Sequence, residues 1–260
     1  MVIGKKKPHG YCVACGKYGR LSKEHFWPKW LRKRMGNPTF TFTYEVVGRA
    51  PKVKVGNLGM LNVRKPCREC NEGWMRDLQN QARPLLEAMM DARFFVMEQD
   101  AQRVVAAWGA MTAYMYAETN QKGSGVSRDH YDWLRLNGIP HPNTRVRTSC
   151  YQPLDRAGWF HAQHLAFTAN PRRPSLSVPP PNGYWISLCI EHLVLQVLGY
   201  CGSEELSFQL DIDPPGIAYH LHPFSRRRRW PPLHGVQVGN LEKLATFPSG
   251  PIAANFRPKP

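Results

Sequence analysis

The sequence predicts an α+β protein, and the pattern of apolar residues along the chain supports this class. Apolar residues repeat at helical spacing over residues 72–91 and 98–118, which predicts two helices. From Thr144 onward, short β-branched and aromatic runs alternate with prolines and turn residues, which predicts strands. Hydrophobic residues make up 42% of the 260 residues, enough for a packed core. We therefore expect a small antiparallel sheet packed against helices.

The individual elements follow from local signals. Residues 39–47 and 52–55 alternate well enough to form strands. Ser127 is a candidate cap for a short helix that ends near Asn137-Gly138, and Asn182-Gly183 is a turn signal. The strands expected in the second half cover residues 145–151, 159–168, 185–198, 208–212 and 216–221. His161 and His164 lie three apart on a predicted strand, so their side chains point to opposite faces and a shared metal site is not expected. His192 lies in an apolar segment, and we interpret all three as packing residues.

Charge is concentrated in the first third of the chain. Residues 1–80 hold 17 Lys and Arg against 5 Asp and Glu, compared with 18 against 14 in residues 81–260. So concentrated a positive field favours a polyanion partner, with nucleic acid first and a membrane surface second. We expect two units: a basic N-terminal module over residues 1–92 and an α+β accessory body over residues 93–260.

We expect neither an integral membrane protein nor a secreted protein. The longest uncharged run within a helical pattern, residues 104–117, is shorter than the roughly 20 residues that cross a bilayer. The N-terminus is basic but no apolar stretch follows it, unlike a secretory signal. We therefore expect a cytoplasmic protein.

Four of the seven cysteines form two C-x-x-C pairs, Cys12 with Cys15 and Cys67 with Cys70. Two such knuckles are typical of a tetrahedral zinc site, and a whole substructure would be looped out between them. Two disulfides or a redox pair are the alternatives. Disulfides fit poorly with a chain that lacks a secretion signal and has three cysteines left over. Cys150, Cys189 and Cys201 lie singly in apolar surroundings and are interpreted as core residues.

Polar residues occur at fixed positions around the knuckles. Glu24-His25 follows the first pair, Asn62 lies five residues before Cys67, and Asn71 directly follows Cys70. This order resembles the HNH endonucleases, a ββα-metal (His-Me finger) family, in their four-cysteine form, over roughly residues 10–80. Two positions depart from the common pattern, since Glu24 stands where Asp is usual and Asn71 where His is usual. The departures favour magnesium or manganese over a nitrogen-preferring metal.

The resemblance implies a role for each residue. His25 would be the general base, Glu24 and Asn71 would hold a catalytic Mg²⁺ or Mn²⁺, and Asn62 would orient His25. The zinc would be structural, since a closed four-thiolate site keeps no open position for chemistry.

Each of these residues also has a structural interpretation. His25 can be a surface or zinc-stabilising histidine, Asn62 can close a turn, and Asn71 can cap the helix. Glu24 and His25 can serve one site only if their strand ends or bends there, and the nearby Pro28 makes such an end plausible. Asp77 would face away from Asn71 on the helix.

Basic residues near these motifs are candidates for phosphate contact. Those in and after the Glu-His segment are interleaved with Trp27, Trp30 and Leu31, a mix that suits phosphate contact on an apolar base. The predicted nucleic-acid contacts are Lys29, Arg32, Lys33, Arg34, Arg64, Lys65 and Arg68. The arginine run 226–229 is either a DNA-contact loop or a solubilising segment.

The resemblance implies a hydrolase: an HNH-type endonuclease that nicks or cleaves double-stranded DNA in a bacterial or phage setting. A non-catalytic zinc protein that binds nucleic acid and an RNase built on the same module are the alternatives. Residues 93–260 could also bind a second copy of the chain, forming a homodimer, or another protein.

Overall fold

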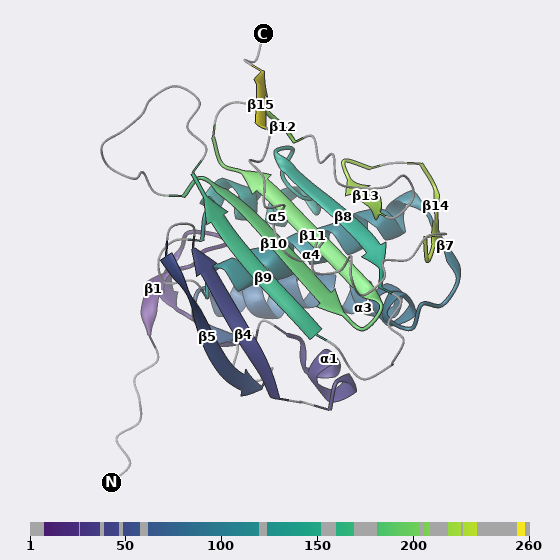
Figure 1. Ribbon diagram of the computed structural model, residues 1–260. Helices are drawn as coiled ribbons and strands as arrows, with labels where there is room; N and C mark the ends of the chain where they lie inside the picture. Colours follow the sequence, from purple (N-terminus) through teal and green to yellow (C-terminus); the bar gives the residue numbers. More distant parts are fainter. Residues whose placement is uncertain are drawn as a thin grey trace.

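A five-stranded sheet forms the centre of the protein, and all its neighbouring strands are antiparallel (Figure 1). The strands lie in the order β13 (Ala218–His222), β8 (Thr144–Cys150), β11 (Leu193–Tyr200), β10 (Gly183–Ile190) and β9 (Phe160–Phe167). Helices pack against this sheet, which confirms the predicted α+β class. The computed structural model describes residues 8–25, 27–36, 39–46, 49–57, 62–119, 124–151, 160–168, 181–202, 205–208, 218–224, 226–232 and 254–257.

Strands β10 and β11 form a tight hairpin, so the prediction of one strand over residues 185–198 is wrong. Ile190 pairs with Leu193, which leaves Glu191 and His192 as the turn. Glu191 has a φ of 52°, a conformation that suits a two-residue hairpin turn. His192 therefore lies in the turn, and its Nδ1 is 2.6 Å from the Tyr151 carbonyl oxygen. Apolar residues on both sides disguise this turn, which contains neither glycine nor asparagine.

The predicted turn at Asn182-Gly183 is also wrong, because Gly183 is the first residue of β10. The Asn182 N–H donates to the Phe167 carbonyl, 3.1 Å away, and so joins the β9–β10 ladder. A Cβ atom on residue 183 would lie 2.3 Å from the Phe167 ring. Glycine is thus required here by close packing and not by a turn.

Three helices lie behind the sheet in the view of Figure 1: α3 (Arg76–Met90), α4 (Gln99–Ala117) and α5 (Arg128–Asn137). Helix α4 is buried from Val105 to its end, which confirms the buried helix predicted over residues 98–118. The Tyr116 hydroxyl donates to the Ala162 carbonyl across this interface at 3.0 Å. Helix α5 ends at Gly138, as predicted, while Ser127 occupies its N-cap position without a side-chain capping bond.

The N-terminal region contains short elements before α3. They are β1 (His9–Tyr11), β2 (Tyr18–Arg20), β3 (Glu24–His25), α1 (Lys29–Arg34), β4 (Thr39–Val46), β5 (Arg49–Asn57), β6 (Asn62–Val63), α2 (Arg68–Cys70) and the π-helical turn η2 (Asn71–Met75). The β4–β5 hairpin confirms the two strands predicted there and lies beside β9 (Figure 1). Helical structure after the second knuckle begins at Arg68, earlier than the predicted residue 72, because Cys67 acts as its N-cap.

Two small ladders complete the fold. Strand β7 (Phe95–Met97) pairs with β14 (Arg228–Trp230), and β12 (Glu205–Phe208) pairs with β15 (Ala254–Arg257). The arginine run 226–229 therefore lies partly in a strand. The Arg227 Nε donates to Glu98 Oε2 at 2.9 Å, and the Arg228 guanidinium lies 5.2 Å from the centre of the Tyr219 ring.

Buried apolar side chains form one core cluster that draws on both predicted units. It includes Trp27 and Met75 from the first unit and Trp108, Leu195 and Trp230 from the second. Cys150 and Cys189 are buried, as predicted, whereas Cys201 is half-buried. His164 is buried as predicted, and the side chain of His161 lies outside the described residues. Among the described residues, no helix combines the length and apolar character needed to cross a bilayer.

Candidate functional site

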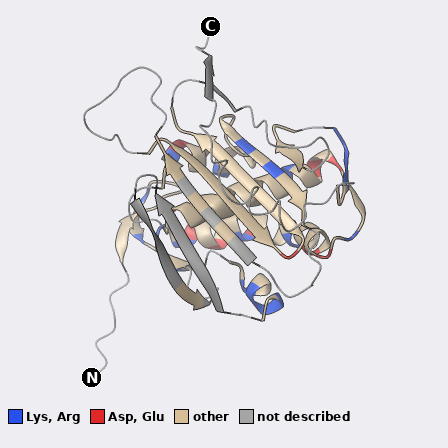
Figure 2. Cartoon of the chain, viewed as in Figure 1, with Lys and Arg blue, Asp and Glu red and all other residues tan. Residues whose placement is uncertain are grey.

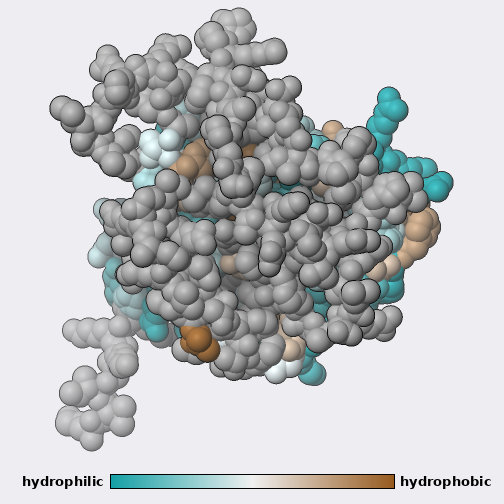
Figure 3. Space-filling model, viewed as in Figure 1, coloured by the Kyte–Doolittle hydropathy of each residue, from teal (hydrophilic) through white to brown (hydrophobic). Residues whose placement is uncertain are grey.

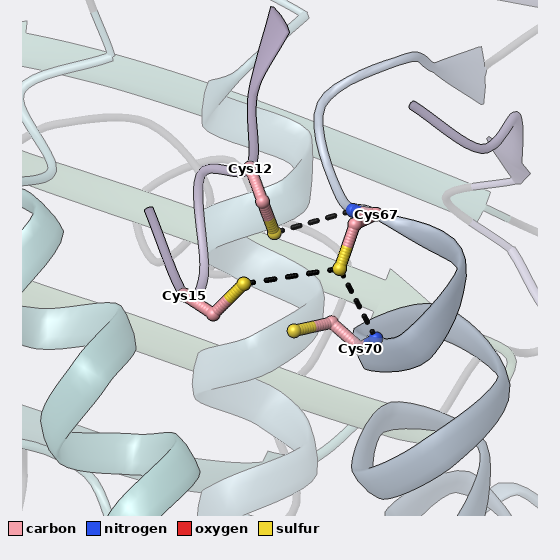
Figure 4. A group of neighbouring side chains, drawn as sticks. All are labelled: Cys12, Cys15, Cys67 and Cys70. Atoms are coloured by element: carbon pink, nitrogen blue, oxygen red, sulfur yellow. Dashed lines mark hydrogen bonds between the residues drawn. The ribbon is translucent and has the colours of Figure 1, made fainter. Parts of the chain in front are cut away.

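Four cysteine sulfurs converge on one point, which confirms that the two knuckles share a site (Figure 4). The sulfurs of Cys12, Cys15, Cys67 and Cys70 all lie within 4.8 Å of one another. All seven cysteines are free thiols, so the disulfide alternative has no support. A zinc ion bound at about 2.3 Å from four sulfurs places them about 3.8 Å apart. The Cys15 and Cys67 sulfurs are 3.8 Å apart, so the cluster has the dimensions of a metal site.

The first knuckle is a tight turn that depends on Gly16. The Gly16 N–H donates to the Cys12 carbonyl at 2.8 Å, and Gly16 has a φ of +67°. A Cβ atom at this position would lie 2.0 Å from the Arg128 guanidinium. Arg128 in turn donates to the Cys15 carbonyl at 3.2 Å. Glycine thus permits both the turn and the contact that attaches the knuckle to α5.

The second knuckle begins a helix, and its backbone is joined to the first. Cys67 is the N-cap of α2, and its sulfur accepts from the Cys70 N–H at 3.5 Å. The Cys67 N–H donates to the Cys12 sulfur at 3.2 Å, and the Val13 N–H donates to the Lys65 carbonyl at 3.0 Å. These backbone hydrogen bonds join the two knuckles and so keep their four sulfurs close together.

The cluster is electrostatically suited to a cation. A hydrogen bond from the Cys70 thiol, helped by backbone N–H groups, lowers the pKa of Cys12 to about 4. Burial raises the pKa of Cys67, and donation to Cys12 raises that of Cys70. One thiolate is therefore favoured while its neighbours resist ionisation, since like charges so close repel. A divalent cation at the centre removes this repulsion and allows all four to ionise.

The Glu24-His25 segment lies beside Asn62 through a two-residue ladder. Strand β3 pairs with β6 in antiparallel register, with Glu24 opposite Val63 and His25 opposite Asn62. Strand β3 ends at His25, so the strand does not continue to Pro28. The side chains of Glu24 and His25 lie outside the described residues. The backbone register nevertheless brings positions 25 and 62 together, and Leu21, which precedes β3, is bridged to Cys67 of the cluster.

Asn71 lies inside the helical segment and does not cap it, so the capping interpretation is wrong. Its dihedral angles, φ −66° and ψ −48°, are helical, and Cys67 takes the N-cap position instead. The Asn71 side-chain amide donates to the Ser22 hydroxyl at 3.1 Å, and that hydroxyl donates to the Pro66 carbonyl at 3.1 Å. These two bonds link the helix to the chain entering β3. Sequence reasoning missed Ser22, because nothing in the local pattern distinguishes it from any polar residue near a strand.

A basic groove lies between α1 and α3, near the predicted nucleic-acid contacts. It has a volume of about 750 Å³. Its lining residues are Pro28, Lys29, Trp30, Lys33, Arg34, Gln79, Arg83 and Glu87. The Arg83 guanidinium lies 5.5 Å from the centre of the Trp30 ring, which gives the groove a cationic and aromatic wall. Figure 2 shows the Lys and Arg positions of α1 in blue.

The seven residues predicted to contact nucleic acid differ in exposure and in whether an acidic side chain already pairs with them. Lys29, Lys33 and Arg64 are exposed and have no ion pair among the described residues, and Arg32 is half-buried. Arg34 bonds to both Asp91 and Glu191. Lys65 lies 3.7 Å from Glu118, and the Arg68 Nε lies 2.7 Å from Glu72. Lys29 and Lys33 are therefore the groove cations most available to an anion.

Comparisons of the chain with family models, with curated proteins and with solved structures found no match in any of the three. The site is thus described by its own geometry: a four-sulfur cluster, a two-residue ladder beside it, a helical segment that starts at the second knuckle, and a basic groove.

Proposed function

We propose that this chain is a metal-dependent endonuclease of the HNH type that hydrolyses phosphodiester bonds in DNA. The observation that carries the proposal is the register of the β3–β6 ladder, in which His25 lies opposite Asn62. The helical segment that begins at Arg68 follows this ladder. Two short strands followed by a helix match the ββα order expected from the resemblance, and this order supports the proposal.

Zinc is the ion proposed for the four-sulfur cluster. Four thiolates in a closed tetrahedral arrangement suit zinc and leave no position for a substrate. The site joins the turn after β1 to the start of α2, and so closes a long loop that contains the β3 and β6 strands. The zinc is therefore structural, and it fixes the ladder relative to the helix.

The catalytic roles are those that the resemblance implies, and the residue types suit them. His25 accepts a proton from the attacking water, since an imidazole titrates near neutral pH. Asn62 holds His25 in orientation as its cross-strand neighbour. Glu24 and Asn71 would hold a Mg²⁺ or Mn²⁺ ion, which supplies electrostatic stabilisation of the phosphate and the leaving oxygen. The expected products carry a 5′ phosphate and a 3′ hydroxyl.

Asn71 fits the role of an oxygen ligand. Its amide nitrogen donates to Ser22, an interaction that fixes the side chain and leaves Oδ1 as the atom for a cation. Amide oxygens are ordinary ligands of hard divalent ions. Ser22 therefore supports the proposed site by orienting Asn71.

The groove between α1 and α3 is the proposed path for the nucleic-acid backbone. Helix α1 begins four residues after His25, so the groove adjoins the proposed catalytic strand along the chain. Lys29 and Lys33 are exposed at its wall, and contacts of this kind to phosphates position a duplex without selecting its sequence. Residues 93–260 would then set target choice or assembly.

The test is a nicking assay on supercoiled plasmid with purified, zinc-loaded protein. We expect open-circular product when Mg²⁺ or Mn²⁺ is added and none when both are omitted. Omission is preferable to a chelator, because a chelator also attacks the sulfur-bound ion. Binding to the plasmid without metal-dependent nicking would favour a non-catalytic zinc protein. Cleavage of a matched RNA but not of DNA would favour an RNase.

A further inference from the structure

Two tyrosines form an exposed aromatic surface on the hairpin of the first knuckle. Tyr11 in β1 pairs directly with Tyr18 in β2, and their side chains are 73% and 67% exposed. The ring centroids are 5.2 Å apart with an interplanar angle of 66°. Neither hydroxyl has a hydrogen-bond partner among the described residues. We call this pair the tyrosine platform.

Arg20 and His9 continue the platform along the same face of the hairpin. His9 pairs with Arg20 two residues from the tyrosines, and both are exposed. Side chains two apart on a strand share a face, so the two tyrosines, the histidine and the arginine form one strip. Within the described residues Arg20 has no ion pair. The first 23 residues of the sequence contain six Lys and Arg and no Asp or Glu, so the strip lies in a purely cationic segment.

The hairpin that carries the platform is held rigidly. The Cys12 N–H donates to the Lys17 carbonyl at 2.9 Å, and Cys12 itself is buried in the core cluster. Behind the strip, a Cβ atom on Gly10 would lie 3.1 Å from Leu21, so Leu21 packs closely against this end of the hairpin. A rigid aromatic surface binds with little loss of conformational entropy.

Two other strongly exposed apolar side chains do not share these features. Phe94 and Leu136 are 70% and 69% exposed, but neither is part of an aromatic pair among the described residues. Figure 3 shows that the described surface in view is mostly hydrophilic at its margins, with small separate hydrophobic spots. The tyrosine platform is therefore distinguished by its pairing and its cations and not by exposure alone.

We infer that the tyrosine platform binds unpaired nucleobases by stacking, with Arg20 and His9 contacting the adjacent phosphates. Flat rings beside cations are the combination that proteins use for single-stranded nucleic acid. Bases inside a duplex are already stacked and do not offer their faces. This inference rests on the proposed function and narrows its substrate class to nucleic acid with a single-stranded segment, such as a flap or a junction.

The experiment measures binding separately from cleavage. The parent protein carries His25→Ala, and Mg²⁺ and Mn²⁺ are omitted at one fixed salt concentration. Fluorescence anisotropy follows a labelled single-stranded DNA, a single-stranded RNA of the same sequence, and a blunt-ended duplex of two fully complementary strands. The variants add Tyr11→Ala with Tyr18→Ala, Tyr11→Phe with Tyr18→Phe, or Phe94→Ala as the matched exposed-aromatic control.

We expect the double alanine variant to bind both single strands at least about fivefold more weakly for each ring removed. The double phenylalanine variant and Phe94→Ala should bind them as the parent does, since both preserve the platform rings. The duplex affinity should stay within about twofold in every variant. If the double alanine variant binds only one of the two single strands more weakly, stacking is still supported. The strand affected then identifies whether the platform binds DNA or RNA.

Three results would overturn the inference. They are unchanged single-strand affinity in the double alanine variant, an equal loss of duplex binding, and a change in oligomeric state by sedimentation that shows the tyrosines to be a self-association surface. Zinc content and circular dichroism of each variant establish that it folds. If the wild-type chain never nicks DNA but tyrosine-dependent single-strand binding persists, only the proposed function fails.

Discussion

His25 and Asn62 lie directly opposite each other in the ladder of β3 and β6. Directly opposed residues are the closest cross-strand neighbours in an antiparallel pair. In the proposed enzyme this register lets Asn62 orient the imidazole of His25. The sulfur cluster lies beside the same ladder, because Leu21 and Cys67 are themselves bridged just before β3 and just after β6. The architecture therefore couples a candidate metal site to a candidate catalytic pair.

Replacing Asn62 with alanine should slow plasmid nicking by about ten- to a hundredfold, because loss of an orienting partner has effects of that size at metal-dependent sites. Zinc content and the unfolding midpoint should stay near wild type. Asn80→Ala is the matched control, since Asn80 is exposed on α3. Wild-type nicking by Asn62→Ala would show that His25 needs no orientation from this strand.

Purified protein should contain one zinc per chain, and Cys67→Ala should lose it. Structural zinc supplies about 10–16 kcal/mol of folding free energy in small modules, so its loss should unfold residues 10–80. Mass spectrometry of the metal content and hydrogen exchange of this segment measure the two effects. Cys189→Ala is the control, because Cys189 is buried in the sheet and lies outside the cluster. This variant protein should keep its zinc. Full zinc content in Cys67→Ala would place any bound metal elsewhere.

Lys33 and Arg34 are adjacent in α1 but should behave differently. The Arg34 Nε donates to Glu191 at 2.9 Å, and its Nη2 lies 2.5 Å from Asp91. Arg34→Gln should therefore lower the free energy of unfolding in urea by about 1 kcal/mol, a modest value because these side chains are partly exposed. Lys33→Gln should leave stability unchanged, weaken DNA binding and reduce the salt slope of the binding constant by about 1. If Lys33→Gln lowered stability and left DNA binding unchanged, while Arg34→Gln did the opposite, Lys33 would be excluded as a phosphate contact.

Buried histidines should make the fold sensitive to acid. Burial lowers the pKa of His164 to about 4, although its bond to the Ser124 carbonyl opposes this shift. The unfolded chain has a histidine pKa near 6.5, so it binds the proton first and stability is lost as pH falls from about 6.5 towards 4. Each such histidine contributes about 1.4 kcal/mol per pH unit over this window. His130, with a pKa of about 3, and His222, with about 4, act in the same direction.

His164→Gln tests this dependence, because glutamine can still donate to Ser124 but does not titrate. Urea unfolding at pH 7.5 and 5.5 should show a smaller loss of stability in the variant than in wild type. Both proteins carry the same cysteines, so acid release of the sulfur-bound metal cancels in the comparison. Equal losses would mean that His164 does not contribute to the acid sensitivity.

Local and periodic signals in the sequence predicted much of this fold. The C-x-x-C spacing of each knuckle, a specific local motif, identified the sulfur cluster. Helical periodicity sustained over many residues identified α4. The turn at Glu191 and His192 was missed because apolar strands on both sides hide it. The helix start at Arg68 was missed because cysteine is an unusual cap.

Long-range contacts leave no local trace. The Arg34–Glu191 bond and the Asn71–Ser22 bond join segments far apart in the chain, so no periodicity or spacing could reveal them. The first changes the interpretation of Arg34 from a phosphate contact to a link between α1 and the β10–β11 turn. The second identifies Ser22 as a support for the proposed metal ligand.

The most direct test of the proposed chemistry is the nicking rate of His25→Ala against wild type, with Mg²⁺ present and equal zinc content in both. The proposal predicts open-circular plasmid from wild type and a rate at least about a hundredfold lower from the variant, with unchanged circular dichroism. Equal rates in the two proteins would contradict the assignment of His25 as the catalytic base.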